Sequence, residues 1–201
     1  MKKAMRNDMS VDAECKDKND RKIAVIFPGI GYHKGKPLLY YAVEMAYQYG
    51  YEVRDVEYHD MPVGVKGDDG LLRKAAEDAY RQACEQLKDI DFTEYADVVL
   101  IGKSIGTVVL ARFAEEYGID AKQIWYTPVE ETFDHAGEKV IAFYGESDPL
   151  SDTRVIKSKA GATGAELYIY PYGNHSIESG DVCRDTGYLH EIMKLTERVF
   201  R

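Results

Sequence analysis

Short apolar runs alternate with stretches of helical periodicity from Lys22 to the end of the chain. The runs KIAVIF at 22–27 and DVVLI at 97–101 are apolar at nearly every position, which is typical of strands buried on both faces of a parallel sheet. The run YEVRDVEY at 51–58 alternates apolar with charged residues, and this pattern indicates a strand at a sheet edge. Further strands are predicted at 123–127, 139–144 and 166–170.

The longer segments between these strands have apolar residues at helical spacing. They predict helices at 36–49, 72–87, 107–117, 153–159 and 187–200. Strands that alternate with helices imply an α/β fold, here a doubly wound, mostly parallel sheet of about six strands flanked by helices. Residues 21–201 contain no repeat or linker and are expected to form a single domain, whereas residues 1–20 are expected to be a polar, mobile tail.

Charge and cysteine content exclude several classes of protein. Acidic residues number 35 against 26 basic ones, so the net charge of −9 argues against a nucleic-acid partner. No apolar run is long enough for a membrane span, and the first 20 residues lack the apolar core of a secretory signal, so a cytoplasmic location is expected. The three cysteines Cys15, Cys84 and Cys183 are odd in number and lack metal-ligand spacing, which predicts neither a disulfide framework nor a zinc site.

The segment GKSIG at 102–106 lies between a predicted buried strand and a predicted helix. This is the pattern G-x-S-x-G, in which a tight strand-to-helix turn lifts a serine hydroxyl above the sheet. The alternative is an ordinary helix entry with Ser104 as a polar residue of the first turn. The strand–turn–helix context favours Ser104 as a nucleophile.

A serine hydroxyl needs a base, and the base needs a group that orients it. The loop YGESDP at 144–149 follows one predicted strand and offers Asp148, and the loop YGNHS at 172–176 follows the next and offers His175. Ligands of open α/β sheets bind beyond the carboxyl ends of the strands, where all these residues are expected. Glu146 and Asp152 are competing candidates for the acid.

The motifs FPGIG, GKSIG, YGESDP and GNHS occur in this order, and with them the chain resembles small α/β hydrolases of the dienelactone-hydrolase-like and esterase-like kind. The resemblance implies that Ser104 attacks a carbonyl carbon, that His175 accepts its proton and that Asp148, in a G-x-x-D-P turn, orients the imidazole. It also implies an oxyanion hole formed by the backbone amide of Ile105 and an amide of the loop after the first strand, either Ile30 or Gly31.

Two departures from that family bear on the substrate. No hairpin is predicted before Lys22, and only eleven residues separate Thr127 from Lys139, where larger relatives insert a lid. An open, lidless site favours a small ester, thioester or short acyl group. The substrate pocket is expected to include Tyr32, Lys103, Thr127 and Pro128. Lys103 either faces an acidic substrate or is directed to solvent or paired locally.

The leading hypothesis is therefore a serine hydrolase acting on a small-molecule acyl substrate without a metal or another cofactor. Acyl transfer or peptide cleavage would use the same three residues, and a non-catalytic binding module could keep the same fold. A nucleotide-binding protein is disfavoured, because FPGIGYHKG is not G-x-G-x-x-G and GKSIGT lacks the leading glycine of a P-loop. The oligomeric state stays open.

Overall fold

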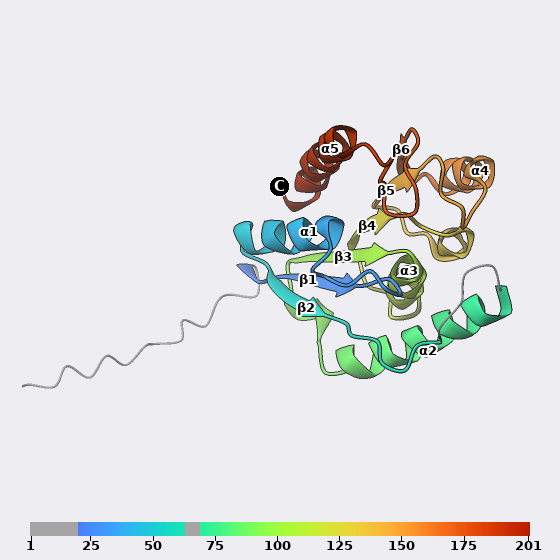
Figure 1. The fold of residues 1–201 in the computed structure, drawn as a ribbon. Helices are drawn as coiled ribbons and strands as arrows, with labels where there is room; N and C mark the ends of the chain where they lie inside the picture. Colours follow the sequence, from blue (N-terminus) through green and yellow to red (C-terminus); the bar gives the residue numbers. More distant parts are fainter. Residues whose placement is uncertain (1–19, 63–68) are drawn as a thin grey trace, which may run out of the picture.

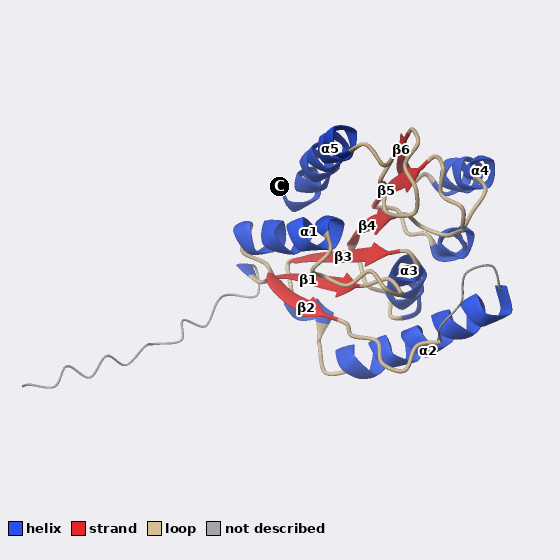
Figure 2. Ribbon diagram, in the orientation of Figure 1, coloured by secondary structure: helices blue, strands red, loops and turns tan. Residues whose placement is uncertain are grey.

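The computed structural model describes residues 20–62 and 69–201, so residues 1–19 of the expected tail lie outside the described part. One sheet organises the described residues (Figure 2). All neighbouring strands are parallel, in the order β2-β1-β3-β4-β5-β6. The predicted doubly wound α/β sheet of six strands is confirmed; its strands are β1 (Lys22–Phe27), β2 (Glu52–Asp55), β3 (Asp97–Lys103), β4 (Lys122–Tyr126), β5 (Val140–Gly145) and β6 (Glu166–Tyr170).

Helices cover both faces of this sheet (Figure 1). One face is covered by α1 (Pro37–Gln48) and α5 (Val182–Phe200). The other is covered by α2 (Asp69–Leu87), α3 (Ile105–Glu116) and α4 (Thr153–Thr163). Two short 3₁₀ helices, η2 (Phe92–Glu94) and η3 (Glu130–His135), lie in the connections. Within the described residues, no helix is both long and apolar enough to cross a membrane.

Strand β3 lies at the centre of the sheet, and this position explains its continuous apolar sequence. Val98 and Leu100 pack into the cluster under α2 and α3, whereas Val99 and Ile101 pack into the cluster under α1 and α5. Full burial of such a side chain contributes about 2 kcal/mol. Burial on both faces therefore fixes the strand whose carboxyl end carries Ser104.

Some predicted boundaries are wrong. Strand β2 ends at Asp55 rather than at residue 58, because the backbone of Glu57 and His59 beyond it is bonded to side chains of α2 instead of to a strand. Helix α5 begins at Val182 rather than 187, because the Asp181 carboxylate accepts hydrogen bonds from the first-turn amides and caps the helix there. Helix α4 also extends further than predicted, to Thr163.

Candidate active site

Ser104 is the single residue between β3 and α3. Its backbone has φ 56° and ψ −125°, a region that non-glycine residues rarely occupy. The conformation is held from both sides: the Ser104 amide donates to the Tyr126 carbonyl at 3.0 Å, and the amide and hydroxyl of Thr107 donate to the Ser104 carbonyl. Backbone strain kept in place by its surroundings is common at functional sites.

Gly102 and Gly106 allow the chain to turn this sharply. A Cβ atom on Gly106 would lie 2.1 Å from the Phe27 carbonyl oxygen, and one on Gly102 would lie 2.3 Å from a Leu110 methyl carbon. No side chain fits at either position without moving the neighbouring backbone or helix. Close packing around the turn therefore requires glycine at both positions.

His175 lies between Ser104 and Asp148. Its Nε2 is 2.7 Å from the Ser104 Oγ, and its Nδ1 is 2.6 Å from the Asp148 Oδ2. A carboxylate can only accept hydrogen bonds, so Nδ1 carries the proton and Nε2 is left to accept the proton of the serine hydroxyl. The Asp148 side chain is 1% exposed and that of His175 20%, so the imidazole screens the carboxylate from water.

The two competing acids have other surroundings in the structure. The Asp152 carboxylate accepts from the Arg154 amide as the N-cap of α4 and pairs with the Arg154 guanidinium. The bond to the Arg154 side chain lowers the pKa of Asp152. The Glu146 side chain is exposed at the surface. Asp148 is the acid whose oxygen meets His175.

The loop that carries His175 is fixed to the loop that carries Asp148. The Ser147 amide donates to the Gly173 carbonyl at 2.8 Å, beside the parallel pairing of β5 with β6. The Asn174 side chain accepts from the amides of Ser176 and Glu178 and closes a tight turn around His175. Asn174 was not among the predicted site residues, although asparagine directly before the histidine is a turn signal that could have suggested it.

The loop after β1 is a closed turn next to Ser104. Gly29 and Tyr32 exchange two backbone hydrogen bonds of 3.1 Å, and Gly31 has a positive φ of 74° at the tip. A Cβ atom on Gly29 would lie 3.3 Å from the Ser104 Cβ, so the turn contacts the nucleophile. The backbone hydrogen bonds within this turn use the amides of Gly29 and Tyr32 and not those of Ile30 and Gly31. Ile105 is the first residue of α3, where the amide has no partner within the helix. These three amides are therefore available to an anion. The amide of Gly29 is already used.

The Lys103 side chain is buried. It is 1% exposed, so the expectation of a solvent-directed lysine is wrong, whereas its place in the substrate pocket stays a prediction. Strand β3 continues through Lys103, and alternation along the strand therefore directs this side chain to the same face as Ile101, beneath the loop after β1. The Lys103 ammonium lies 4.9 Å from the centroid of the Tyr32 ring.

The other expected pocket residues, Tyr32, Thr127 and Pro128, are buried as well. The Tyr32 oxygen accepts from the Leu38 amide at 3.2 Å, and burial raises the pKa of Tyr32 to about 12. Thr127 follows β4 with φ 46°, and its hydroxyl has no partner among the described residues. Tyr32 also lines a cavity of about 340 Å³ together with Ser176 and Ile177, next to His175 in the chain. That the three expected residues belong to the substrate pocket stays a prediction.

No group of three or more His, Cys, Asp or Glu side chains is arranged to hold a metal ion in the described parts of the chain. The chemistry available to the site is that of a hydroxyl, an imidazole and a carboxylate in series, next to free amide donors. This set is suited to nucleophilic attack on a carbonyl carbon.

Solved structures of other proteins share the fold of this chain. Neither a protein-family model nor a curated protein sequence matches the chain. Solved structures match it over most of its length: the protein Est1E from Butyrivibrio proteoclasticus has a TM-score of 0.64 at 12% identity, covering 90% of this chain and 87% of that one. An alpha-beta serine hydrolase homologue from Coxiella burnetii has a TM-score of 0.60 at 15% identity, covering 89% and 84%. The chain has the α/β-hydrolase fold.

A third structure supports the same assignment. An esterase from Pyrococcus furiosus has a TM-score of 0.57 at 12% identity, covering 92% of this chain and 85% of the esterase. Within the α/β-hydrolase fold of this chain, Ser104, Asp148 and His175 follow β3, β5 and β6 at the carboxyl edge of the sheet. The connection from Thr127 to Lys139 holds only the short helix η3, so no lid is inserted there.

Proposed function

We propose that this protein is a serine hydrolase that cleaves a small carboxylic ester, thioester or related acyl bond through an acyl-enzyme. The observation that carries the proposal is the continuous series of contacts from Asp148 through His175 to Ser104, with 2.6 and 2.7 Å between the bonded atoms. The serine lies on a strained turn at the carboxyl edge of an α/β-hydrolase sheet. Esterases among the structural neighbours support the same reaction class.

The first half-reaction forms the acyl-enzyme. The Ser104 Oγ bonds to the carbonyl carbon while its proton passes to the Nε2 of His175, and Asp148 stabilises the resulting imidazolium. The carbonyl oxygen becomes an oxyanion, for which the amides of Ile105 and Ile30 are the proposed donors, with Gly31 as the alternative to Ile30. One such donor is worth about 10²–10³ in kcat. His175 then protonates the leaving oxygen or sulfur, and the carbonyl double bond reforms.

The second half-reaction releases the acid. A water molecule gives a proton to the Nε2 of His175 as its oxygen bonds to the acyl carbon. Collapse of this intermediate breaks the bond to the Ser104 Oγ, which recovers its proton from His175. The chemistry needs no electron acceptor and no further cofactor.

Turnover of p-nitrophenyl acetate by the wild type and by Ser104→Ala tests the proposal. We expect the alanine variant to lose at least about 10³-fold in kcat, because the nucleophile is removed while the fold is kept. A neighbouring change of similar size, Ser147→Ala, is the matched control and should retain wild-type turnover. Equal turnover by wild type and Ser104→Ala would refute the assignment.

A further inference from the structure

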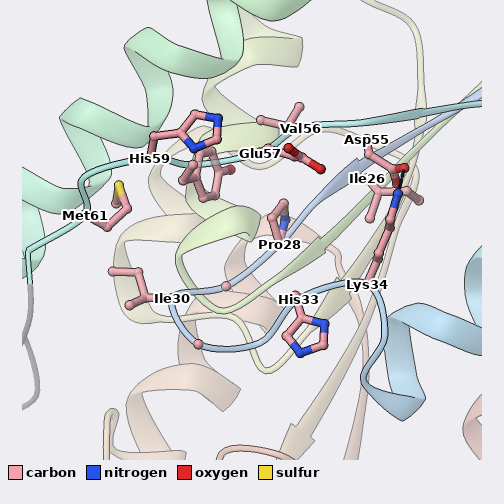
Figure 3. A pocket seen from close by; sticks show the side chains of 13 residues that line it. Ile26, Pro28, Ile30, His33, Lys34, Asp55, Val56, Glu57, His59 and Met61 are labelled. Carbon is pink, nitrogen blue, oxygen red and sulfur yellow. Dashed lines mark hydrogen bonds and ion pairs between the residues drawn. The ribbon is translucent and has the colours of Figure 1, made fainter.

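A cavity of about 500 Å³ lies beside the loop after β1 (Figure 3). The residues that close it come from two neighbouring strand ends: the turn Pro28–Gly31 after β1, and residues 55–61 at and after the end of β2. Its volume falls in the range of about 300–1,000 Å³ typical of small-molecule sites.

Apolar side chains form most of the wall of this cavity, with Ile26 and Val56 buried in the sheet and Met61 partly exposed at the opening. The charged groups Lys34 and Asp55 at the wall pair with each other, so they cancel each other's charge there. The wall also contains Glu57, and the buried hydroxyl of Tyr58 has no hydrogen-bond partner among the described residues. A ligand gains from apolar contact, whereas a second carboxylate near Asp55 disfavours an anion. The wall is therefore suited to an uncharged, largely apolar group rather than to an anionic one.

The turn after β1 borders both this cavity and the nucleophile. Gly29 lines the cavity and lies against Ser104, where an added Cβ would be 3.3 Å from the Ser104 Cβ. The next residue, Ile30, also lines the cavity, and its amide is a proposed oxyanion donor. A substrate carbonyl group that this amide binds would therefore lie next to the cavity.

The order of the strands decides which part of the substrate this cavity receives. The cavity adjoins β1 and β2, on one side of β3 and Ser104, whereas His175 and Asp148 follow β6 and β5 on the other side. The leaving group must stay next to the Nε2 of His175 to be protonated. The acyl group is the substituent that is left to point away from the histidine, toward β1 and β2.

Two glutamines of α2 hold the outer wall of the cavity in place. The Gln86 side chain bonds to both the amide and the carbonyl of Glu57, at 2.9 and 2.8 Å. The Gln82 side chain bonds to both groups of His59 in the same way, at 2.8 and 3.0 Å. The extended segment after β2 is thus tied to a helix, which makes the cavity largely preformed.

We propose that this cavity is the acyl-binding subsite of the enzyme, and that the natural substrate carries an apolar acyl group the size of a hexanoyl or phenylacetyl group. The inference rests on the proposed acyl-enzyme reaction and adds a substrate class to it. Acetyl esters leave the cavity empty, so they react more slowly but do not depend on its wall.

The test compares p-nitrophenyl acetate with p-nitrophenyl hexanoate, which share a leaving group and differ only in the acyl chain. Met61→Trp narrows the cavity and is expected to lower the hexanoate-to-acetate ratio of kcat/KM by about tenfold or more. Met61→Ala widens it and should shift the preference toward p-nitrophenyl octanoate. The two Met61 variants change the cavity volume in opposite directions. If Met61→Trp does not fold, Met61→Ala still tests whether the cavity binds the acyl chain.

The matched control is Leu72→Trp, which narrows a second cavity of about 340 Å³ lined by residues of α2, α3 and η3. It should leave the hexanoate-to-acetate ratio unchanged. A fall in the ratio for Leu72→Trp, or an unchanged chain-length preference in both Met61 variants, would overturn the subsite. If acetate turnover survives Ser104→Ala, the proposed reaction itself fails; if turnover needs Ser104 but ignores Met61, only the subsite fails.

Discussion

Replacement of Asp148 by asparagine changes one atom at the centre of the proposed triad. The Asp148 Oδ1 accepts from the Leu150 amide at 3.0 Å, and an asparagine oxygen can keep that bond. The amide nitrogen would then face the Nδ1 of His175 in place of the Oδ2, and it can only donate. Nδ1 must give up its proton, so Nε2 becomes protonated and can no longer accept the proton of Ser104.

The expected loss is about 10⁴-fold in kcat, the effect of this change in a Ser–His–Asp triad. That factor corresponds to about 5 kcal/mol of transition-state stabilisation. The assay is kcat for p-nitrophenyl acetate, measured with the melting temperature of each variant. Stability should change little, because the bond to Leu150 and the buried volume are kept.

The controls are the two acids that the structure places away from His175. Asp152→Asn keeps a good N-cap for α4, and Glu146→Gln alters an exposed side chain, so both should retain wild-type turnover. A folded Asp148→Asn enzyme with more than a tenth of the wild-type kcat would refute the tautomer argument. So would a large loss in either control.

Three further changes test the supports of the site. Gly106→Ala should lower the free energy of unfolding by about 3 kcal/mol, because the added Cβ would lie 2.1 Å from the Phe27 carbonyl oxygen. Urea denaturation measures this loss, and an unchanged midpoint would contradict the prediction. Thr132→Val removes the 2.7 Å hydrogen bond between the buried hydroxyls of Thr132 and Thr107. It should lower the free energy of unfolding by about 1–2 kcal/mol in the same assay. An unchanged free energy would mean that this bond does not stabilise the fold. Asp185→Asn tests a pH effect. Hydrogen bonds from Ser179 lower the folded-state pKa of Asp185. The contribution of the Asp185 carboxylate to folding stability is therefore complete above the unfolded pKa of about 4 and is lost as the pH falls through the folded-state pKa. The variant should therefore lose more stability relative to wild type at pH 7 than at pH 3, and a deficit that grows with acid would contradict the sign.

Much of the fold and of the nucleophile's turn is predictable from local sequence. Continuous apolar runs identified β1 and β3 as central strands, and the glycines of GKSIG identified a turn that close packing does require. The loops with Asp148 and His175 follow β5 and β6 as expected. Each of these features depends on neighbours in the sequence or on the general rule for parallel sheets.

The surroundings of the site were less predictable, because they depend on strand ends and distant contacts. The predicted strand stopped at residue 101, but β3 continues to Lys103, and two more residues of alternation turn that lysine inward. The wall after β2 depends on Gln82 and Gln86, whose partners lie more than twenty positions away in the chain. The local sequence does not indicate the contacts of either glutamine, because polar residues of a helix usually face water.

Labelling with a fluorophosphonate tests the central claim most directly, because this probe bonds only to a serine oxygen activated by a base. We expect one adduct per chain, located by peptide mass spectrometry on Ser104, and its loss in Ser104→Ala. Labelling should also slow by orders of magnitude in His175→Ala, which keeps the serine but removes the base. An unlabelled folded protein, or labelling that is unchanged in Ser104→Ala, would contradict the account.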